Sequence, residues 1–361
     1  MAMVTSLVCC GSTKGGSSGT DGSSAGSDGN PVGTDGSVVG TGGVSAAGGN
    51  AGGAVSTGGN TATTGTLHAV REYSLSSPSE PFTITLGPDG NLWFTDPGSN
   101  KIGTITPAGV ITEFDLPTLD RKPYRIAKGS DGNLWFTEQG GAAIGRITPT
   151  GTVTEFPTQN GLTFGIAPGP DGNMWFLEAG VDKVGCITPA GAISQFSIPS
   201  ADCGAKEITA GPDGNLWFTE TVTRKIGRTT PTGDIKEFQL LDSTSGPSGI
   251  TAGPDGNLWY ADSNGNQIGR ITPTGTITKF PLPTAASYPD YIALGPDGNL
   301  WFTEFRAGVL HAWIGRITTD GTITEFSVSA NAASLDTGVA GPDGSLWFTN
   351  SGGRAIVRVT P

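Results

Sequence analysis

One ten-residue phrase occurs seven times in this chain and restricts it to repeat architectures. In its fullest form the phrase reads Gly-Pro-Asp-Gly-Asn-Leu-Trp-Phe-Thr-Glu, and a tryptophan marks each copy. These tryptophans are Trp93, Trp135, Trp175, Trp217, Trp259, Trp301 and Trp347, and successive copies are 42, 40, 42, 42, 42 and 46 residues apart. A fixed period in this range is typical of a solenoid, a propeller or an array.

The inside of one copy indicates which of these architectures forms. Four short apolar segments, at residues 81–86, 91–95, 102–106 and 110–114, alternate with turns rich in Gly, Pro, Asn and Asp. Pro presets φ and Gly accepts a positive φ, so these turns reverse the chain sharply. Four short strands in a repeat of this length match one propeller blade. The sequence therefore predicts an all-β fold, a seven-bladed β-propeller of four-stranded blades.

The two ends of the repeat region predict how the ring closes. The last copy stops after three strands, at residues 356–360. Far upstream, Val70-Arg71-Glu72-Tyr73 resembles Ile111-Thr112-Glu113-Phe114, a fourth strand. We expect this N-terminal strand to complete the last blade, which removes the open edge that a linear array would leave.

The chain divides into three parts by composition. Residues 67–361 are the propeller, and residues 11–66 are mostly Gly, Ser, Thr, Ala and Asp without an aromatic residue, which predicts a disordered linker. Residues 1–10 end in Cys9-Cys10 after Leu7-Val8 and resemble the end of a bacterial lipoprotein signal. The alternative is a disordered N-terminus with two incidental cysteines. We expect an extracytoplasmic protein, secreted or lipid-anchored to the cell envelope.

Charge and cysteine content limit the partners. The net charge is −12, the pI is about 4.5 and there is no basic cluster, which argues against nucleic acid. We expect a monomer that binds a small molecule or a peptide and touches a membrane only through the N-terminal anchor. Cys186 and Cys203 are a candidate disulfide in an oxidising compartment, and two free thiols are the alternative.

Two charged rows repeat from blade to blade. Acids end the second strand, at Asp96, Glu138, Glu178, Glu220, Asp262 and Glu304, and arginines occupy the third strand at Arg146, Arg228, Arg270, Arg316 and Arg358. Because buried charges need partners, we expect each acid to pair with an arginine or with turn amides rather than to form a metal site. Blades 1 and 3 carry Thr104 and Cys186 instead of arginine, so Asp96 and Glu178 are expected to be the freest acids.

Residues that break the repeat are the candidates for a functional site. A variable pair precedes the Ile or Val of each innermost strand: Phe82-Thr83, Tyr124-Arg125, Phe164-Gly165, Lys206-Glu207, Ser248-Gly249, Asp290-Tyr291 and Thr337-Gly338. This end of the strand is expected to line the mouth of the central channel, together with the extended loop 305–313 of blade 6.

The candidates at this mouth are charged and aromatic, which suits a polar, partly apolar ligand. The expected ligand-binding residues are Tyr124, Arg125, Lys206, Glu207, Tyr291, Glu304, Arg306 and Trp313, and the catalytic candidates are Asp290 and His311. Solvated rim side chains are the alternative for each. The chain has no Gly-x-Ser-x-Gly, Walker, His-Glu-x-x-His or Cys-x-x-Cys motif, and the sequence does not identify a metal.

The repeated phrases also carry a family resemblance. Gly-Pro-Asp-Gly-Asn-Leu-Trp-Phe-Thr-Glu followed by Ile-Gly-Arg-Ile-Thr-Pro-x-Gly-x-Ile-Thr-Glu-Phe resembles the blades of streptogramin B lyase, also called virginiamycin B lyase, over residues 67–361. The resemblance implies a seven-bladed propeller. It also implies a carbon–oxygen lyase that confers antibiotic resistance by opening a cyclic depsipeptide through elimination at an ester, assisted by Mg²⁺.

The resemblance assigns catalysis to histidines at the start of the innermost strand in the last two blades, with nearby glutamates. In this chain the two histidine positions fall on Asp290 and Thr337, one glutamate on Leu335, and a late-blade acid near Asn350. None of the family's catalytic residues is kept at these positions.

Two functions therefore stay open. One is a related enzyme that uses Asp290, Glu304, Lys206 and His311. The other is a non-catalytic binding or scaffold propeller at the cell surface. Convergence of those four side chains on one small site would favour the enzyme, and their separation would favour binding.

Overall fold

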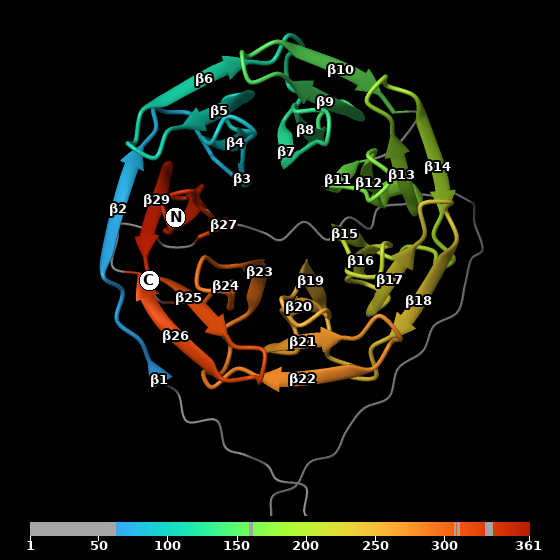
Figure 1. Cartoon of the computed structure of the whole chain (residues 1–361), viewed down its shortest axis with the longest axis vertical. Coiled ribbons are helices and arrows are strands. Elements are labelled where there is room, and N and C mark those ends of the chain that lie inside the picture. The colour runs from blue at the N-terminus through green and yellow to red at the C-terminus, as the bar shows by residue number, and fades with distance from the viewer. Residues whose placement is uncertain (1–62, 159–161, 307, 309–310, 329–334) are drawn as a thin grey trace, which may run out of the picture. The chain divides into compact units, whose positions relative to one another are not determined.

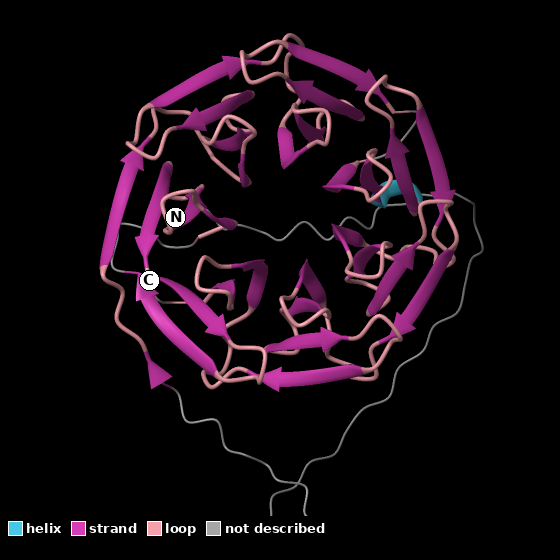
Figure 2. Ribbon diagram, viewed as in Figure 1, coloured by secondary structure: helices cyan, strands magenta, loops and turns pink. Residues whose placement is uncertain are grey.

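The computed structural model describes residues 63–158, 162–306, 308, 311–328 and 335–361. Seven sheets are arranged in a ring, each with its first strand near the ring axis and its last strand at the periphery (Figure 1). The only helical element among these residues is the short 3₁₀ turn η1 (Ala179–Val181), cyan in Figure 2. The predicted all-β, seven-bladed propeller is confirmed.

Each blade is an antiparallel meander that runs from the innermost strand outward. Blades 1 to 3 are β3 (Ile84–Leu86), β4 (Leu92–Asp96), β5 (Lys101–Ile105), β6 (Ile111–Asp115); β7 (Pro123–Lys128), β8 (Leu134–Glu138), β9 (Ala143–Ile147), β10 (Val153–Pro157); and β11 (Thr163–Pro168), β12 (Met174–Glu178), β13 (Lys183–Ile187), β14 (Ile193–Ser197). Blades 4 to 6 are β15 (Ala205–Ala210), β16 (Leu216–Glu220), β17 (Lys225–Thr229), β18 (Ile235–Gln239); β19 (Pro247–Ala252), β20 (Leu258–Asp262), β21 (Gln267–Ile271), β22 (Ile277–Pro281); and β23 (Pro289–Leu294), β24 (Leu300–Glu304), β25 (Ala312–Ile317), β26 (Ile323–Val328).

Blade 7 is built from both ends of the chain. Its inner strands are β27 (Gly338–Ala340), β28 (Leu346–Asn350) and β29 (Ala355–Thr360), and its outermost strand is the N-terminal β2 (Ala69–Ser74). The ladder between β2 and β29 is antiparallel and runs from Ala69↔Thr360 to Ser74↔Ala355. Figure 1 shows the blue β2 outside the red β29. The closure predicted from residues 70–73 is confirmed.

A second N-terminal segment, around Gly65, replaces a turn glycine that blade 7 lacks. In six blades the aromatic residue of the outermost strand covers a turn glycine of the next blade; for example, a Cβ on Gly151 would lie 2.3 Å from the Phe114 ring. Blade 7 has no such turn, because its third and fourth strands, β29 and β2, are not consecutive in the sequence. Gly65 takes the place of that glycine, since a Cβ on it would lie 1.9 Å from the Phe326 ring.

The same segment extends the sheet of blade 6. Strand β1 (Thr63–Thr64) pairs parallel with β26, and the N–H of Gly65 donates to the Glu325 carbonyl at 3.0 Å. Residues 63–66, which the composition assigned to the linker, are therefore part of the propeller. The rest of that linker, residues 11–62, and the signal-like residues 1–10 lie outside the described residues.

The repeated tryptophans form the core between blades. All seven are buried, and Trp93, for example, packs with Ile126, Leu134 and Phe136 of the following blade. The indole N–H of Trp93 donates to the carboxylate of Asp89 at 3.0 Å, so the Asp-Gly turn also satisfies the buried donor. Six further copies of this bond repeat around the ring.

The predicted pairing of the arginine row with the acid row is wrong. Strand register places each arginine opposite the tryptophan, as in Trp217↔Arg228, and not beside the acid at the other end of the strand. Arg228 instead lies 3.7 Å from Asp213 of the turn and stacks on Trp217 at 5.7 Å. Arg270, Arg316 and Arg358 repeat this arrangement.

Several buried acids have the other predicted partners, which are turn amides for Asp96 and an arginine outside the row for Glu138, where Arg121 lies 3.3 Å away. Asp96 accepts hydrogen bonds from the N–H groups of Glu80 and Ser99 at 2.8 and 3.2 Å, and Glu178 accepts one from the Gln195 amide at 2.6 Å. Both acids are fully buried, as are the other acids of the row, and neither has a cation within ion-pair distance among the described residues. The hydrogen bonds of Asp96 and Glu178 thus lie within their own blades.

Glu138 of this row leads to a prediction of pH-dependent stability. Burial raises the pKa of Glu138 from 4.5 to about 8, and the nearby Glu155 adds to the shift while Arg121 opposes it. Between these two pH values only the folded state binds the proton, so stability falls as the pH rises through this window. We expect Glu138→Gln to be more stable than the parent by about 2 kcal/mol at pH 9 and nearly equal at pH 5.

Thermal unfolding at pH 5, 7 and 9 would check this prediction. Glu80→Gln is the matched control, because Glu80 is exposed and should give no pH-dependent difference. A Glu138→Gln effect of the same size at all three pH values would contradict the assignment of the proton to this carboxyl.

Cys186 and Cys203 are free thiols and both are buried, so the disulfide prediction is wrong. Cys186 lies opposite Trp175, near the Asp171 turn. The backbone N–H of Cys203 bonds to Asp182, which precedes the other end of the same strand, β13. The two residues thus belong to opposite ends of the blade. Burial raises the pKa of Cys186 to about 12, which disfavours the reactive thiolate.

No helix in the described part of the chain is long and apolar enough to cross a membrane.

Candidate functional site

A β-bulge on the innermost strand brings the variable pairs to the ring axis. In blade 2, Pro123 pairs with Glu138 and Ile126 pairs with Phe136, so Tyr124 and Arg125 together oppose one residue of β8. The same register shift occurs in blades 3 to 6. Because a bulge re-aims side chains, both members of a pair leave the regular alternation of the strand.

In blades 2, 4 and 6 the threonine of the repeated phrase accepts a backbone hydrogen bond from the bulge. In blade 4, Thr219 Oγ1 accepts the N–H of Glu207 at 3.2 Å and donates to the Ser248 carbonyl of the next blade at 2.7 Å. Blades 3 and 5 have Leu177 and Ala261 at this position, and there the second member of the pair is glycine. The scaffold therefore connects neighbouring pairs around the ring.

The ladder of blade 7 corrects the sequence alignment by one residue. Gly338 pairs with Phe348 as Ile126 pairs with Phe136, so the variable pair is Asp336-Thr337 and not Thr337-Gly338. The N–H of Thr337 bonds to Thr349 at 3.2 Å, as that of Arg125 bonds to Thr137 at 3.0 Å.

Sequence reasoning missed Asp336 although a signal for it existed. The first members of the seven pairs, from residue 82 to residue 336, are spaced 42, 40, 42, 42, 42 and 46 apart, which is the spacing of the tryptophans. In the other six blades the pair is followed by an Ile. In blade 7 the residue after the pair is Gly338, and the pair was therefore placed one residue too late, before Val339.

The first members of the pairs separate into two arcs. The aromatic arc is Phe82, Tyr124 and Phe164, in blades 1 to 3; the polar arc is Lys206, Ser248, Asp290 and Asp336, in blades 4 to 7. Within the aromatic arc Phe82 stacks on Tyr124 with centroids 4.4 Å apart, and Phe164 meets Tyr124 edge-on at 5.5 Å. All three rings are half-buried, so apolar surface remains accessible near the axis.

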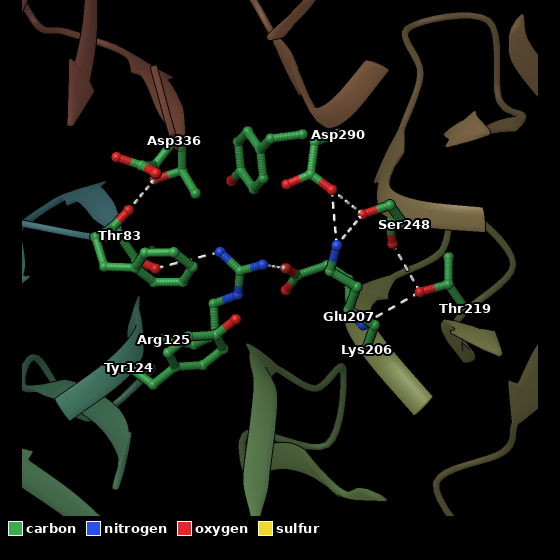
Figure 3. A network of polar contacts seen from close by, with 12 residues as sticks. Thr83, Tyr124, Arg125, Lys206, Glu207, Thr219, Ser248, Asp290 and Asp336 are labelled. Atoms are coloured by element: carbon green, nitrogen blue, oxygen red, sulfur yellow. Dashed lines mark hydrogen bonds and ion pairs between the residues drawn. The ribbon is translucent and has the colours of Figure 1, made fainter. Parts of the chain in front are cut away.

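Three residues of the polar arc form one hydrogen-bonded group. Lys206 Nζ lies 2.7 Å from Asp290 Oδ1 and 2.5 Å from Ser248 Oγ, and Ser248 Oγ also donates to Asp290 Oδ1 (Figure 3). Burial opposes the charge on Asp290, but the Lys206 ammonium and these hydrogen bonds outweigh it and lower the pKa of Asp290 to about 2. The Asp290 side chain is nonetheless 48% exposed.

Arg125 and Glu207 form a buried ion pair that connects blades 2 and 4. Arg125 Nη2 lies 2.9 Å from Glu207 Oε2, and the side chains are 6% and 9% exposed. Arg125 also donates to Thr83 at 3.3 Å and lies over the rings of Phe82 and Tyr124, each at 5.2 Å. Burial raises the pKa of Glu207, and Arg125 opposes that shift.

Asp336 has a different environment from Asp290. Its carboxylate accepts the N–H of Ser351 at 2.8 Å and the Ser351 hydroxyl at 3.1 Å, and no described cation lies within ion-pair distance of it. Burial raises the pKa of Asp336 to about 7, Asp290 adds to the shift, and the Ser351 bonds and Arg125 oppose it.

The structure brings together only part of the predicted site. Tyr124, Arg125, Lys206, Glu207 and Asp290 form the contacts above, and the Tyr291 ring lies 5.9 Å from the Arg125 guanidinium. Their role in ligand binding stays a prediction.

Glu304, Arg306 and Trp313 form a separate group within blade 6. Arg306 Nε donates to Glu304 at 2.8 Å, Arg306 Nη2 lies 3.0 Å from Glu325 of the outermost strand, and the guanidinium covers the Trp313 ring at 3.8 Å. His311 is exposed just before β25. Convergence of Glu304 and His311 with Asp290 and Lys206 is therefore not found, because the guanidinium holds Glu304 inside the blade.

The ring centre does not fit Mg²⁺. This ion prefers an octahedral set of carboxylate and water oxygens. Here the carboxylates of Asp290 and Glu207 face the Lys206 ammonium and the Arg125 guanidinium. In the part of the chain that the structure describes, no three His, Cys, Asp or Glu side chains are grouped to hold a metal ion. We derive no chemical step through a metal.

Comparison with known proteins identifies the family. The model of the virginiamycin B lyase family matches residues 56–203 and 157–361. The chain belongs to the virginiamycin B lyase family. A streptogramin B lyase structure is 38% identical, with a TM-score of 0.76 over 81% of this chain and 97% of that chain. Virginiamycin B lyase from Staphylococcus aureus is 37% identical, with a TM-score of 0.76 over 81% and 99%.

A third structure is a catalytically inactive virginiamycin B lyase from Staphylococcus aureus with quinupristin, 37% identical, with a TM-score of 0.75 over 81% of this chain and 99% of that chain. Comparison with curated proteins finds no significant match. The virginiamycin B lyase resemblance placed two histidines at the start of the innermost strand in the last two blades. By the observed ladders, the position equivalent to Asp290 in blade 7 is Asp336, so this member of the family carries two aspartates there.

Proposed function

We propose that this member of the virginiamycin B lyase family is a ligand-binding propeller whose site is the ring centre. The observation that carries the proposal is the division of the first-member positions into an aromatic arc and a polar arc. Half-buried rings offer stacking surface, and a few placed charges fix orientation, which is the usual composition of a small-molecule site. A small molecule or peptide with an apolar face and polar groups would suit both arcs.

The state of Asp290 favours binding over elimination. Elimination at an ester needs a base whose pKa is near the working pH. Ion pairing with Lys206 and hydrogen bonds overcome the effect of burial and hold the pKa of Asp290 at about 2, so its carboxylate is a weak base. The Asp290 carboxylate is better suited to fixing Lys206 and Ser248 than to removing a proton.

We also propose that the protein acts outside the cytoplasm. The support is the lipoprotein-like segment at residues 1–10 and the Gly/Ser-rich segment that follows it. Lipid attachment would place the propeller at the surface of the cell envelope.

Quinupristin is a suitable first probe, because it accompanies a similar protein in a solved structure. We expect the full-length chain to bind quinupristin, and Tyr124→Ala to weaken binding roughly tenfold through loss of the stacked ring. Titration calorimetry would measure binding. Leu119→Ala, at an exposed residue outside the two arcs, is the control and should leave the affinity unchanged. Equal affinity of Tyr124→Ala and the parent would exclude the ring centre as the site.

A second candidate function is elimination with Asp336 as the base. Burial raises the pKa of Asp336 to about 7, which is the base strength that the reaction needs, while that of Asp290 is near 2. Ring opening leaves the mass of quinupristin unchanged, so chromatography must separate the linear from the cyclic form. Ring opening that Asp336→Asn abolishes, and Asp115→Asn on the exposed outer strand preserves, would favour this enzyme over a binding protein.

A further inference from the structure

The charges at the ring centre do not balance. The variable pairs contribute two cations, Arg125 and Lys206, and three carboxyl groups, Glu207, Asp290 and Asp336. Each cation is within 2.9 Å of one carboxylate, Arg125 with Glu207 and Lys206 with Asp290. Asp336 is left with the neutral donors of Ser351. The group therefore carries one surplus negative charge whenever Asp336 is ionised.

Asp336 and the aromatic arc are neighbours across the closure of the ring. Thr337, the residue after Asp336, donates its hydroxyl to the Phe82 carbonyl at 3.2 Å, and Thr349 donates to the same carbonyl at 2.7 Å. The first members of blades 7 and 1 are thus Asp336 and Phe82, and Phe82 stacks on Tyr124. The backbone that carries Asp336 is therefore joined, through Thr337, to the backbone of the first residue of the aromatic arc.

Building on the proposed ligand site, we infer that the ring centre selects a cationic aromatic ligand. Its ammonium or guanidinium group would lie beside Asp336, and its ring would lie on the aromatic arc. The cation would neutralise the surplus carboxylate, and charge-assisted hydrogen bonds to a carboxylate are stronger than neutral ones. A ligand with a carboxylate instead would face Asp336 and Asp290 and be disfavoured.

Binding should depend on pH in a defined direction. Burial raises the pKa of Asp336 to about 7; the charged groups that face it are Asp290, which adds to the shift, and Arg125, which opposes it. Below that value Asp336 is neutral and the surplus charge disappears. Affinity for a cationic ligand should therefore rise as the pH increases through 7, provided that the ligand stays protonated.

The test uses three phenyl compounds whose short side chains carry different charges: 2-phenylethylamine, which is cationic, 2-phenylethanol, which is neutral, and phenylacetate, which is anionic. Ligand-observed NMR on the full-length protein would measure each dissociation constant at pH 5.5 and pH 8. We expect the amine to bind roughly tenfold tighter than the alcohol at pH 8, with most of that preference lost at pH 5.5.

Asp336→Asn should abolish the preference for the amine while the alcohol still binds, and Asp115→Asn, which removes the same charge from an 85% exposed side chain, should not. Equal binding of amine and alcohol, lost in Tyr124→Ala, would overturn the charge preference but leave the ligand site standing. A preference that survives Asp336→Asn would overturn the role of Asp336. No binding of any probe or of quinupristin would overturn the site and this inference with it.

Discussion

Arg125→Met should lower the free energy of unfolding by about 3–5 kcal/mol, because it leaves the Glu207 carboxylate buried without its partner. Arg125 and Glu207 are both more than nine-tenths buried, and Arg125 is the only residue within ion-pair distance of Glu207 in the described part of the chain. Burial already raises the pKa of Glu207, so the carboxyl would take up a proton rather than stay charged. Urea unfolding at pH 7 would measure the loss.

Two further variants distinguish the contribution of the ion pair to the free energy of unfolding from that of side-chain packing. Arg125→Met combined with Glu207→Met removes both charges and should recover most of the stability, since apolar residues of similar volume often replace a buried pair without loss. Lys206→Met breaks a half-exposed pair and should cost only about 1 kcal/mol or less. Equal losses for Arg125→Met and Lys206→Met would mean that burial of the first pair has no energetic consequence.

Removing residues 1–74 should prevent the propeller from forming a stable ring, whereas removing residues 1–62 should leave it folded. The longer deletion takes away β2, whose six residues pair with β29, and with it Tyr73, which stacks on Trp347 at 5.5 Å and covers Gly109 of blade 1. The loss would expose one edge of blade 7 and part of the core on both sides. The free energy lost with these contacts is comparable to the whole free energy of unfolding of a domain, roughly 5–15 kcal/mol.

Near-ultraviolet circular dichroism and proteolysis of the two truncated chains would check this prediction. A third chain without residues 1–66 lacks β1 and Gly65 but keeps β2. It should fold with an intermediate stability, because only the parallel strand on β26 and the cover over Phe326 are lost. A folded chain beginning at residue 75 would show that the closing strand is dispensable.

The fold could be predicted because its signals are local and repeated. Turn residues of the Asp-Gly kind, β-branched strands and a period of about 42 residues recur seven times, and Val70-Arg71-Glu72-Tyr73 matches the strand that the last copy lacks. Repetition also identified the variable pairs correctly in six blades. In blade 7 the pair was assigned one residue too late, because Gly338 occupies the position that a β-branched residue has in the other blades.

The contacts of the candidate site could not be predicted in the same way. The pair of Arg125 and Glu207 joins blades 2 and 4 across the ring, and nothing in the repeat specifies which side chains of the ring centre reach each other. Strand register determines which side chains the arginine row contacts. It places Arg228 opposite Trp217, and Lys225 opposite Glu220. Asp290 has a cation within ion-pair distance, Lys206, whereas Asp336 has only the neutral donors of Ser351, and the repeat does not specify this difference.

Because blade 7 lacks the turn between its third and fourth strands, the propeller does not require its chain ends to lie in that blade. The N–H of His68 bonds to the Thr360 carbonyl at 3.0 Å, so the two ends of the fold already lie side by side. Six other blades have an intact turn at the same place, such as the one that contains Gly233. A circular permutant that joins Pro361 to residue 66 by a short linker and opens the chain at the Gly233 turn would keep every blade, with a different one now assembled from both termini.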